Sequence, residues 1–279
     1  MILKLIKHDL KAILPDFYGI YLALIGLSIL GPFVLRVSPE WLTVIYMLVI
    51  IGTFIAVGVV TFIALINLFN KRLFSHQGYL NLTLPVSITS LLGSKIITGM
   101  IISIITGFVT VVSFLIFAIS ISWLTLGDLS RFAPIWDAIV ESKILWELGR
   151  VYVAFTPLGL ANMAYSLALL LFVVTFTHTS YVRKNRLMVG IIMYVGIGLT
   201  LSTIQTNFFN VNLLVGDGDI ELLAWALNDI VLYLPRFLAS TSVTIHWLNL
   251  LMMTGLYVAI TGIFFSLSQY LIEHKIEVE

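Results

Sequence analysis

The chain carries five histidines, the residue type that most often binds metals or transfers protons near neutral pH. They are His8, His76, His178, His246 and His274. No two of them are four residues apart and no H-E-x-x-H sequence occurs, so the sequence predicts no helix-borne zinc site. We expect His178 and His246 to be boundary residues at the ends of apolar segments.

A second candidate for chemistry is Gly93-Ser94-Lys95, which resembles the end of a phosphate-binding loop. The complete loop also needs a glycine five residues before Gly93, and Ile88 stands there. We therefore expect no ATP to bind this chain through such a loop, and we expect Lys95 to anchor the base of a helix. No pair of carboxylates lies on an apolar face, as an intramembrane hydrolase would need. The chain is predicted to have no catalytic, cofactor-binding or metal-binding residue and not to be an enzyme.

The composition indicates a membrane protein. Of 279 residues, 60% are hydrophobic and 10% are charged, whereas about 25% are charged in an ordinary soluble domain. The excess apolar residues are expected to face lipid. The absence of cysteine excludes disulfides, iron–sulfur clusters and thiolate zinc sites. The net charge of +1 gives no reason to expect a nucleic-acid partner.

Six runs are long and apolar enough to cross a membrane, which takes about 20 residues. They are residues 17–35, 41–69, 91–123, 152–178, 187–206 and 247–272. Their central parts lack Asp, Glu, Lys and Arg, whereas ion-coupled carriers usually bury ionisable groups there. The sequence thus predicts an all-α, polytopic protein with a single transmembrane domain over residues 1–279, and argues against ion-coupled transport.

Orientation follows from the basic residues, which collect on the cytoplasmic side of a membrane. With both termini inside, ten of the fifteen basic residues lie inside: Lys4, Lys7, Lys11, Lys71, Arg72, Lys95, Arg183, Lys184, Arg186 and Lys275. Both termini are therefore predicted to be cytoplasmic. The segments 124–151 and 207–246 are then extracellular, and each shows a helical pattern. We interpret 207–246 as short helices that dip into the outer leaflet or pack over the outer mouth, or as an ordinary amphipathic loop.

Residues 1–14 predict an amphipathic helix, because Ile2, Ile6, Leu10 and Ile13 share one face. We expect it to lie along the inner leaflet, with its lysines toward anionic headgroups. The alternative is a plain cytoplasmic extension of the first span. Pro15 is expected to end this helix, because proline removes a backbone donor. The lysines on the opposite face are Lys4, Lys7 and Lys11.

The cytoplasmic connection over residues 71–90 differs from a generic loop. Gly78 permits a tight backbone turn, and Tyr79 and Leu80 directly after it are apolar. Apolar groups exposed in such a connection indicate contact with a partner or with the membrane. Ser87 or Thr89 can cap the helix that follows.

This connection resembles the first cytoplasmic loop of permease subunits of bacterial ATP-binding-cassette transporters in the second-type exporter superfamily. That loop carries an aromatic residue, an acidic stretch, and then G-Y-L, T-L-P-V and S-K. Here the matching residues are Phe74, Gly78-Tyr79-Leu80, Thr83-Leu84-Pro85-Val86 and Ser94-Lys95. The layout of spans and termini is also similar over the whole chain. His76 and Gln77 stand where the family has acidic residues, which removes the basis for a salt bridge there but not for docking.

The resemblance implies a coupling helix that docks on a separate ATPase subunit, which would bind ATP and magnesium. The docking residues would be Lys71, Arg72, Phe74, Ser75, His76, Gln77, Gly78, Tyr79, Leu80, Thr83, Leu84 and Pro85. A second contact would involve Arg183, Lys184 and Arg186, whose alternative role is to anchor the chain on the cytoplasmic side.

The same resemblance implies a permease subunit of an ATP-driven exporter in a bacterial cytoplasmic membrane. It would pair with a second permease, identical or related, within membrane lipid. Its cargo would be an amphipathic peptide, a lipid or a lipophilic drug, since the spans are rich in aromatic residues and poor in charge. Two alternatives stay open: a module that senses or resists antimicrobial peptides in the same transporter class, and a scaffolding membrane protein that is not coupled to ATP.

Overall fold

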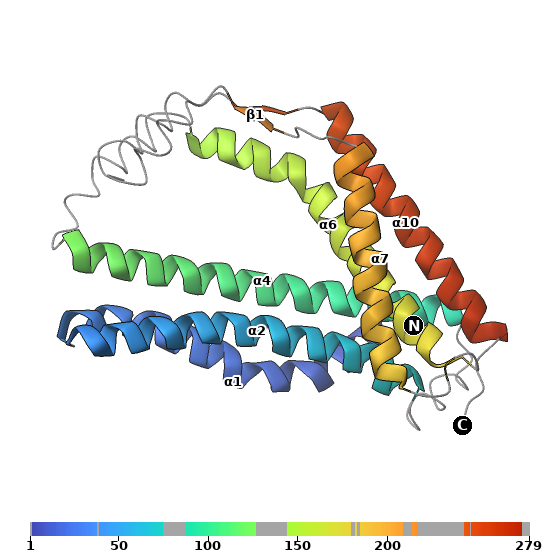
Figure 1. The fold of residues 1–279 in the computed structure, drawn as a ribbon, viewed down its shortest axis with the longest axis horizontal. Helices are drawn as coiled ribbons and strands as arrows, with labels where there is room; N and C mark the ends of the chain where they lie inside the picture. Colours follow the sequence, from blue (N-terminus) through green and yellow to red (C-terminus); the bar gives the residue numbers. More distant parts are fainter. Residues whose placement is uncertain are drawn as a thin grey trace. The chain divides into compact units, whose positions relative to one another are not determined.

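The computed structural model describes residues 2–37, 39–74, 87–126, 144–179, 182, 185–208, 214–216, 243–245 and 247–274. Within these ranges every element is a helix, apart from one pair of three-residue strands (Figure 1). The helices are α1 (Ile2–Val37), α2 (Glu40–Phe74), α4 (Ile88–Leu126), α6 (Ile144–Thr177), α7 (Arg186–Phe208) and α10 (Trp247–His274). The predicted helical class is thereby confirmed.

Five stretches of helix are long and apolar enough to cross a membrane, which makes this a multi-pass membrane protein. They are Ile2–Gly31, Trp41–Asn70, Ile88–Phe117, Gly149–Thr177 and Trp247–His274. Each overlaps one of the predicted spans. In α7 the apolar stretch is shorter, Met188–Thr203. Large apolar side chains such as Leu48, Phe108 and Leu251 are exposed on these helices, as lipid-facing residues are.

The expectation that Pro15 ends the first helix is wrong, because α1 continues through it to Val37. One buried stripe runs along α1 on both sides of the proline. Its members are Ile6, Asp9, Ile13, Phe17, Tyr21, Leu24 and Ser28. Pro15 itself lies on the exposed side. Packing along the stripe offsets the single backbone hydrogen bond that the proline removes.

The chain divides into two compact units, which we describe separately. Unit 1 comprises Met1–Thr125, Met163–Gly198 and Ile260–Glu279. Unit 2 comprises Leu126–Asn162 and Leu199–Ala259. Helices α6, α7 and α10 contribute to both. The single transmembrane domain over residues 1–279 stays a prediction.

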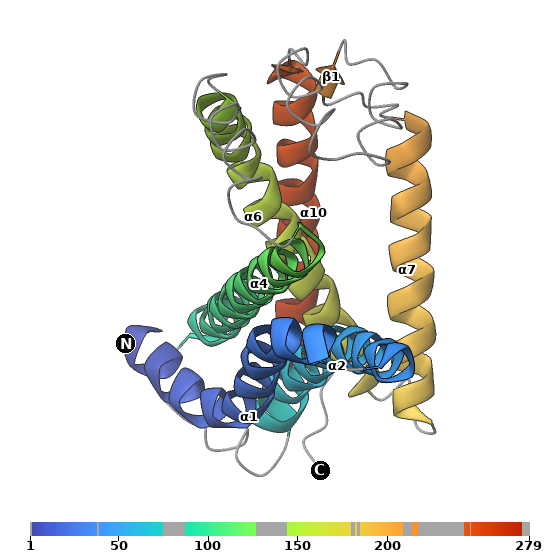
Figure 2. The same cartoon turned by 90° about the vertical axis from the view of Figure 1, so that its left-hand side faces the viewer.

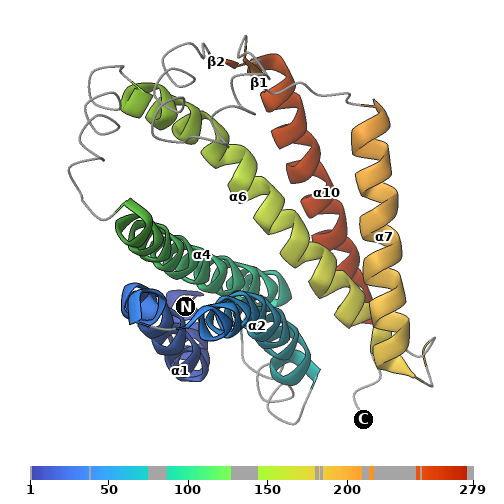
Figure 3. The ribbon, with the colours of Figure 1, turned by 60° about the vertical axis from the view of Figure 1, so that its left-hand side comes forward.

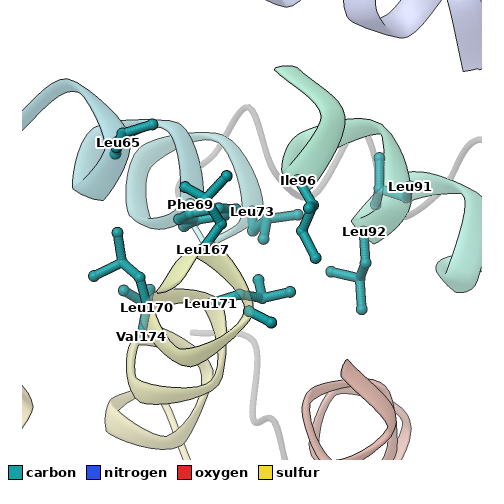
Figure 4. Packing of buried hydrophobic residues seen from close by; sticks show 11 residues of the cluster. Leu65, Phe69, Leu73, Leu91, Leu92, Ile96, Leu167, Leu170, Leu171 and Val174 are labelled. Carbon is teal, nitrogen blue, oxygen red and sulfur yellow. The ribbon is translucent and has the colours of Figure 1, made fainter. Parts of the chain in front are cut away.

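The first core of unit 1 joins α2, α4 and α6. Side chains from the three helices interdigitate in Figure 4. The cluster contains Leu65, Phe69, Leu73, Leu91, Leu92, Ile96, Leu167, Ala168, Leu170, Leu171 and Val174. The second half of α10 packs on α6 beside it, where the rings of Phe172 and Phe264 stack with centroids 5.2 Å apart (Figure 2).

The second core of unit 1 joins α1, α2 and α4, which run side by side (Figure 3). It contains Ile13, Phe17, Tyr21, Leu24, Val57, Leu68 and Ile102. Because α2 and α4 contribute to both cores, they form the centre of unit 1.

Unit 2 holds the strand pair, which the sequence did not indicate. Strand β1 (Leu214–Gly216) pairs antiparallel with β2 (Val243–Ile245), and Val215 is opposite Thr244. The pair joins the two ends of the predicted extracellular segment 207–246, which we expected to be short helices or a loop. Residues 217–242, like most of segment 124–151, lie outside the described residues.

A glycine sets the close approach of the helices in the first core. A Cβ atom at Gly99 would lie 3.1 Å from one Cδ of Leu167 and 3.3 Å from a Cδ of Leu65. We predict that Gly99→Leu lowers the free energy of unfolding by about 1–3 kcal/mol, because the core must expand around it. Thermal unfolding of the purified chain in detergent measures this. Gly107→Leu on the same helix is the matched control, since Gly107 is exposed and nothing lies within 4 Å of its Cβ position. Equal loss in the two variants would contradict the prediction.

Candidate functional site

The candidate site is the end of unit 1 at which α2 and α6 finish and α4 and α7 begin, which we call the loop end. Leu73 of α2, Leu91 of α4 and Val174 of α6 meet there in the first core. Both predicted cytoplasmic connections, after α2 and after α6, therefore leave the same end of unit 1.

The predicted docking residues are described only in part. Lys71 and Arg72 lie in the last turn of α2, and the placement of their side chains is not described. Phe74 is the last residue of α2 and is half-buried. Arg186 is the exposed first residue of α7. The other predicted contacts lie outside the described residues: Ser75, His76, Gln77, Gly78, Tyr79, Leu80, Thr83, Leu84, Pro85, Arg183 and Lys184.

A ring stack joins the two connections. The rings of Phe74 and His178 lie 4.4 Å apart between centroids and only 9° from parallel. Nδ1 of His178 lies 2.9 Å from the carbonyl oxygen of Val174, which can only accept, so Nδ1 carries the hydrogen. The sequence suggested that His178 is no more than a boundary residue. Its neighbour Phe74 is far away in the chain, so no local pattern could reveal the stack.

The surroundings of His178 favour its neutral form. Burial lowers the pKa of His178 below its ordinary value of 6.5, because the charged ring would lose hydration. The hydrogen bond to the Val174 carbonyl acts in the opposite direction, and the positive charge of Arg186 lowers the pKa further. Arg186, one of the predicted second contacts, thus acts on the ring that stacks on Phe74.

Local backbone bonds fix the turn from α6 to α7. The amides of His178, Thr179 and Val182 each donate to the carbonyl three residues earlier, at 3.1 Å. Asn185 has a φ of 54°, in the left-handed region that asparagine tolerates, and its carbonyl accepts from Val189 at the start of α7. A Cβ atom at Gly190 would lie 3.3 Å from Cγ2 of Thr177, so α7 begins tightly against the end of α6.

The start of α4 is fixed by a cap and an ion pair. Ser87 Oγ accepts from the amide of Ser90 at 3.4 Å, and the Ser87 carbonyl accepts from the amide of Leu91. This confirms Ser87 as the helix cap. Two turns later, Nζ of Lys95 lies 2.5 Å from Oδ2 of Asp9 in α1, and both side chains are buried. The sequence placed Lys95 at the base of this helix but did not indicate Asp9 as its partner.

These contacts hold helix ends together. Among the described residues, no group of three His, Cys, Asp or Glu could hold a metal ion. The arrangement instead fixes both ends of each connection on a packed core. A force applied to either connection would reach α2, α4 and α6.

The lowered pKa of His178 predicts a pH-dependent stability. Well above pH 6.5 the ring is neutral in both the folded and the unfolded chain, so it contributes no pH dependence. As the pH falls below 6.5, the unfolded chain takes up a proton that the folded chain resists, so the folded state loses stability. We predict that His178→Phe, which keeps a ring beside Phe74, loses less stability than the unsubstituted chain between about pH 7.5 and about pH 5.5.

The melting temperature at the two pH values measures this effect. His8→Phe, at an exposed position of α1, is the matched control and should retain the full loss. An equal loss for His178→Phe and the unsubstituted chain would refute the role of His178.

The chain was compared with protein-family models, curated proteins and solved structures. No protein-family model, no curated protein and no solved structure matches the chain. The comparisons therefore assign it to no family, and the function must be argued from the loop end.

Proposed function

We propose that this chain is the membrane permease subunit of an ATP-driven exporter in a bacterial cytoplasmic membrane, energised by a separate ATPase subunit. The observation that carries the proposal is the Phe74–His178 stack. It holds the connection after α2 and the connection after α6 together at one end of unit 1. An ATPase docked there would touch both connections at once. The motif that follows Phe74 supplies aromatic and apolar residues for docking.

In this proposal the chain crosses the membrane six times, with both termini in the cytoplasm. Two packing contacts support it. Leu5, near the start of α1, and Ile272, near the end of α10, both pack against the first core together with Phe74 and Ile88. The start of α1 and the end of α10 thus lie toward the loop end, and ten of the fifteen basic residues fall in the segments predicted to be cytoplasmic. The short apolar stretch of α7 provides the sixth crossing.

The two ATPase subunits bind ATP and magnesium and close against each other. This closure pushes the segment over residues 75–86. Because this segment continues directly into α2 and α4, the movement passes into both cores of unit 1. A second permease subunit completes the path. The cargo is an amphipathic peptide, a lipid or a lipophilic drug, since the candidate spans are apolar.

A resistance module against antimicrobial peptides would use the same loop end and the same ATPase. A scaffolding protein would need neither, and the docking experiment below separates it from both.

The proposed topology predicts which positions are accessible from outside the cell. The chain has no cysteine, so single cysteines can be introduced into it directly. Ser87 and Trp146 are both exposed, at the loop end and near the start of α6 respectively. We predict that a membrane-impermeant maleimide labels Trp146→Cys in intact cells, and labels Ser87→Cys only after the cells are opened. Labelling of Ser87→Cys in intact cells would refute the assigned orientation.

The docking proposal predicts that Tyr79→Ala weakens the complex with the ATPase subunit. Removing a buried aromatic side chain from an interface typically costs at least about 2 kcal/mol, or about 30-fold in affinity. The measurement is co-purification of the chain with an ATP-binding-cassette ATPase subunit, together with ATP turnover per complex.

Tyr152→Ala is the matched control, because Tyr152 is 77% exposed near the opposite end of α6. It should leave both measurements unchanged. The proposal fails if the unsubstituted chain neither retains an ATPase nor alters its turnover.

A further inference from the structure

The ion pair between Asp9 and Lys95 is the most deeply buried charge contact among the described residues. The side chain of Lys95 is 1% exposed and that of Asp9 is 5% exposed. Removing two charges from water is costly, so each of them requires the other. A pair of apolar side chains would stabilise the fold at least as much as the ion pair does. Stability alone therefore does not explain why charged residues lie at these two positions.

The pair belongs to a longer seam between α1 and α4. Asp9 and Lys95 are separated by 86 residues, and Tyr21 hydrogen-bonds Thr106 across 85 residues. Similar offsets mean that the two helices run parallel in one register over more than three turns. Further along, the same offset of 85 separates Ser28 from Ser113, and both are fully buried. The N-terminal segment of α1 thus packs as part of the bundle.

The position of the pair relates it to the segment over residues 75–86. Ser87 directly follows that segment and caps α4, and Lys95 lies eight residues further along the helix. Eight residues of α-helix span about 12 Å. A push on the segment therefore reaches Lys95 through two turns of capped helix, and reaches Asp9 and α1 through the ion pair.

We propose that Asp9 and Lys95 are positioning residues that lock the register of α1 on α4, so that both helices move as one piece when the ATPase drives the segment over residues 75–86. The proposal rests on the proposed function. A buried ion pair suits this task because a slip of one helical turn would leave both charges unpaired. An apolar contact allows such a slip.

The experiment uses the chain purified in complex with its ATPase in lipid nanodiscs. Asp9→Asn and Lys95→Met each remove one charge of the buried ion pair, and should lower the melting temperature as well as the chain-dependent ATP turnover. The double variant Asp9→Leu/Lys95→Met removes both charges. We expect it to recover the melting temperature while its chain-dependent turnover stays at least about 5-fold below that of the unsubstituted complex.

Matched controls lie on the exposed side of the same helix. Asp16→Asn and Lys11→Met make the same chemical changes at exposed positions, and should leave stability and turnover unchanged. Recovery of both melting temperature and turnover in Asp9→Leu/Lys95→Met would show a purely structural pair, and would overturn the inference alone. If the unsubstituted chain associates with no ATPase, the proposed function fails and takes the inference with it.

A cross-link provides a second measurement. In the cysteine-free chain, Asp9→Cys/Lys95→Cys can be joined by a short bis-maleimide, with N-ethylmaleimide as the control that reacts without joining. If α1 and α4 move as one piece, the joined complex turns over ATP faster than the control-treated complex. If the joined complex is slower, the two helices must slide during turnover and the register lock is refuted.

Discussion

The structure depends on one constraint: polar groups in apolar surroundings must find their hydrogen-bond partners within the protein. Helices satisfy the backbone, and many hydroxyl side chains follow the same rule, although the buried Ser113 hydroxyl has no hydrogen-bond partner among the described residues. In α4, Thr98, Thr106 and Thr110 each donate to the carbonyl four residues earlier, and Ser94 donates to the carbonyl three residues earlier. Thr61 of α2, Thr175 of α6 and Ser268 of α10 do the same across four residues. A helix that satisfies its own hydroxyls can pack closely against its neighbours.

Polar contacts between helices therefore fix the position of one helix along another, which hydrogen bonds within a helix cannot do. The Tyr21 hydroxyl pairs with Thr106, and the Tyr46 hydroxyl donates to the carbonyl of Leu27 in α1. With Asp9 and Lys95, these contacts fix where α1 stands along α2 and α4. Van der Waals packing favours close approach but tolerates small shifts along the helix axis, whereas a paired charge or hydroxyl does not. The register of unit 1 is thus set by a small group of polar side chains within a largely apolar surface.

The same constraint explains what the sequence could predict. Long apolar runs predict helices, and α2, α4, α7 and α10 each contain the expected run and extend beyond it, while α6 ends one residue before its run does. Pro15 misled the reading of α1, because a propensity rule counts one lost hydrogen bond and not the buried stripe on both sides of it. The strand pair at Leu214–Gly216 and Val243–Ile245 was missed because strands of three residues carry too little periodicity to detect.

The candidate site divides in the same way. Ser87 could be predicted as a cap because capping depends on neighbouring residues, and Lys95 could be placed near the start of α4 because a long apolar run follows it. Asp9, the partner of Lys95, and His178, the partner of Phe74, are each distant in sequence from the residue that they contact. Only tertiary packing brings the two pairs together. The two contacts join the helices beside the 75–86 segment to different neighbours. Phe74 joins α2 to the end of α6, and Lys95 joins α4 to α1. A displacement of that segment would then be divided between two helices that the chain itself does not connect to it. In the proposed permease, this division would let one contact point move several helices together.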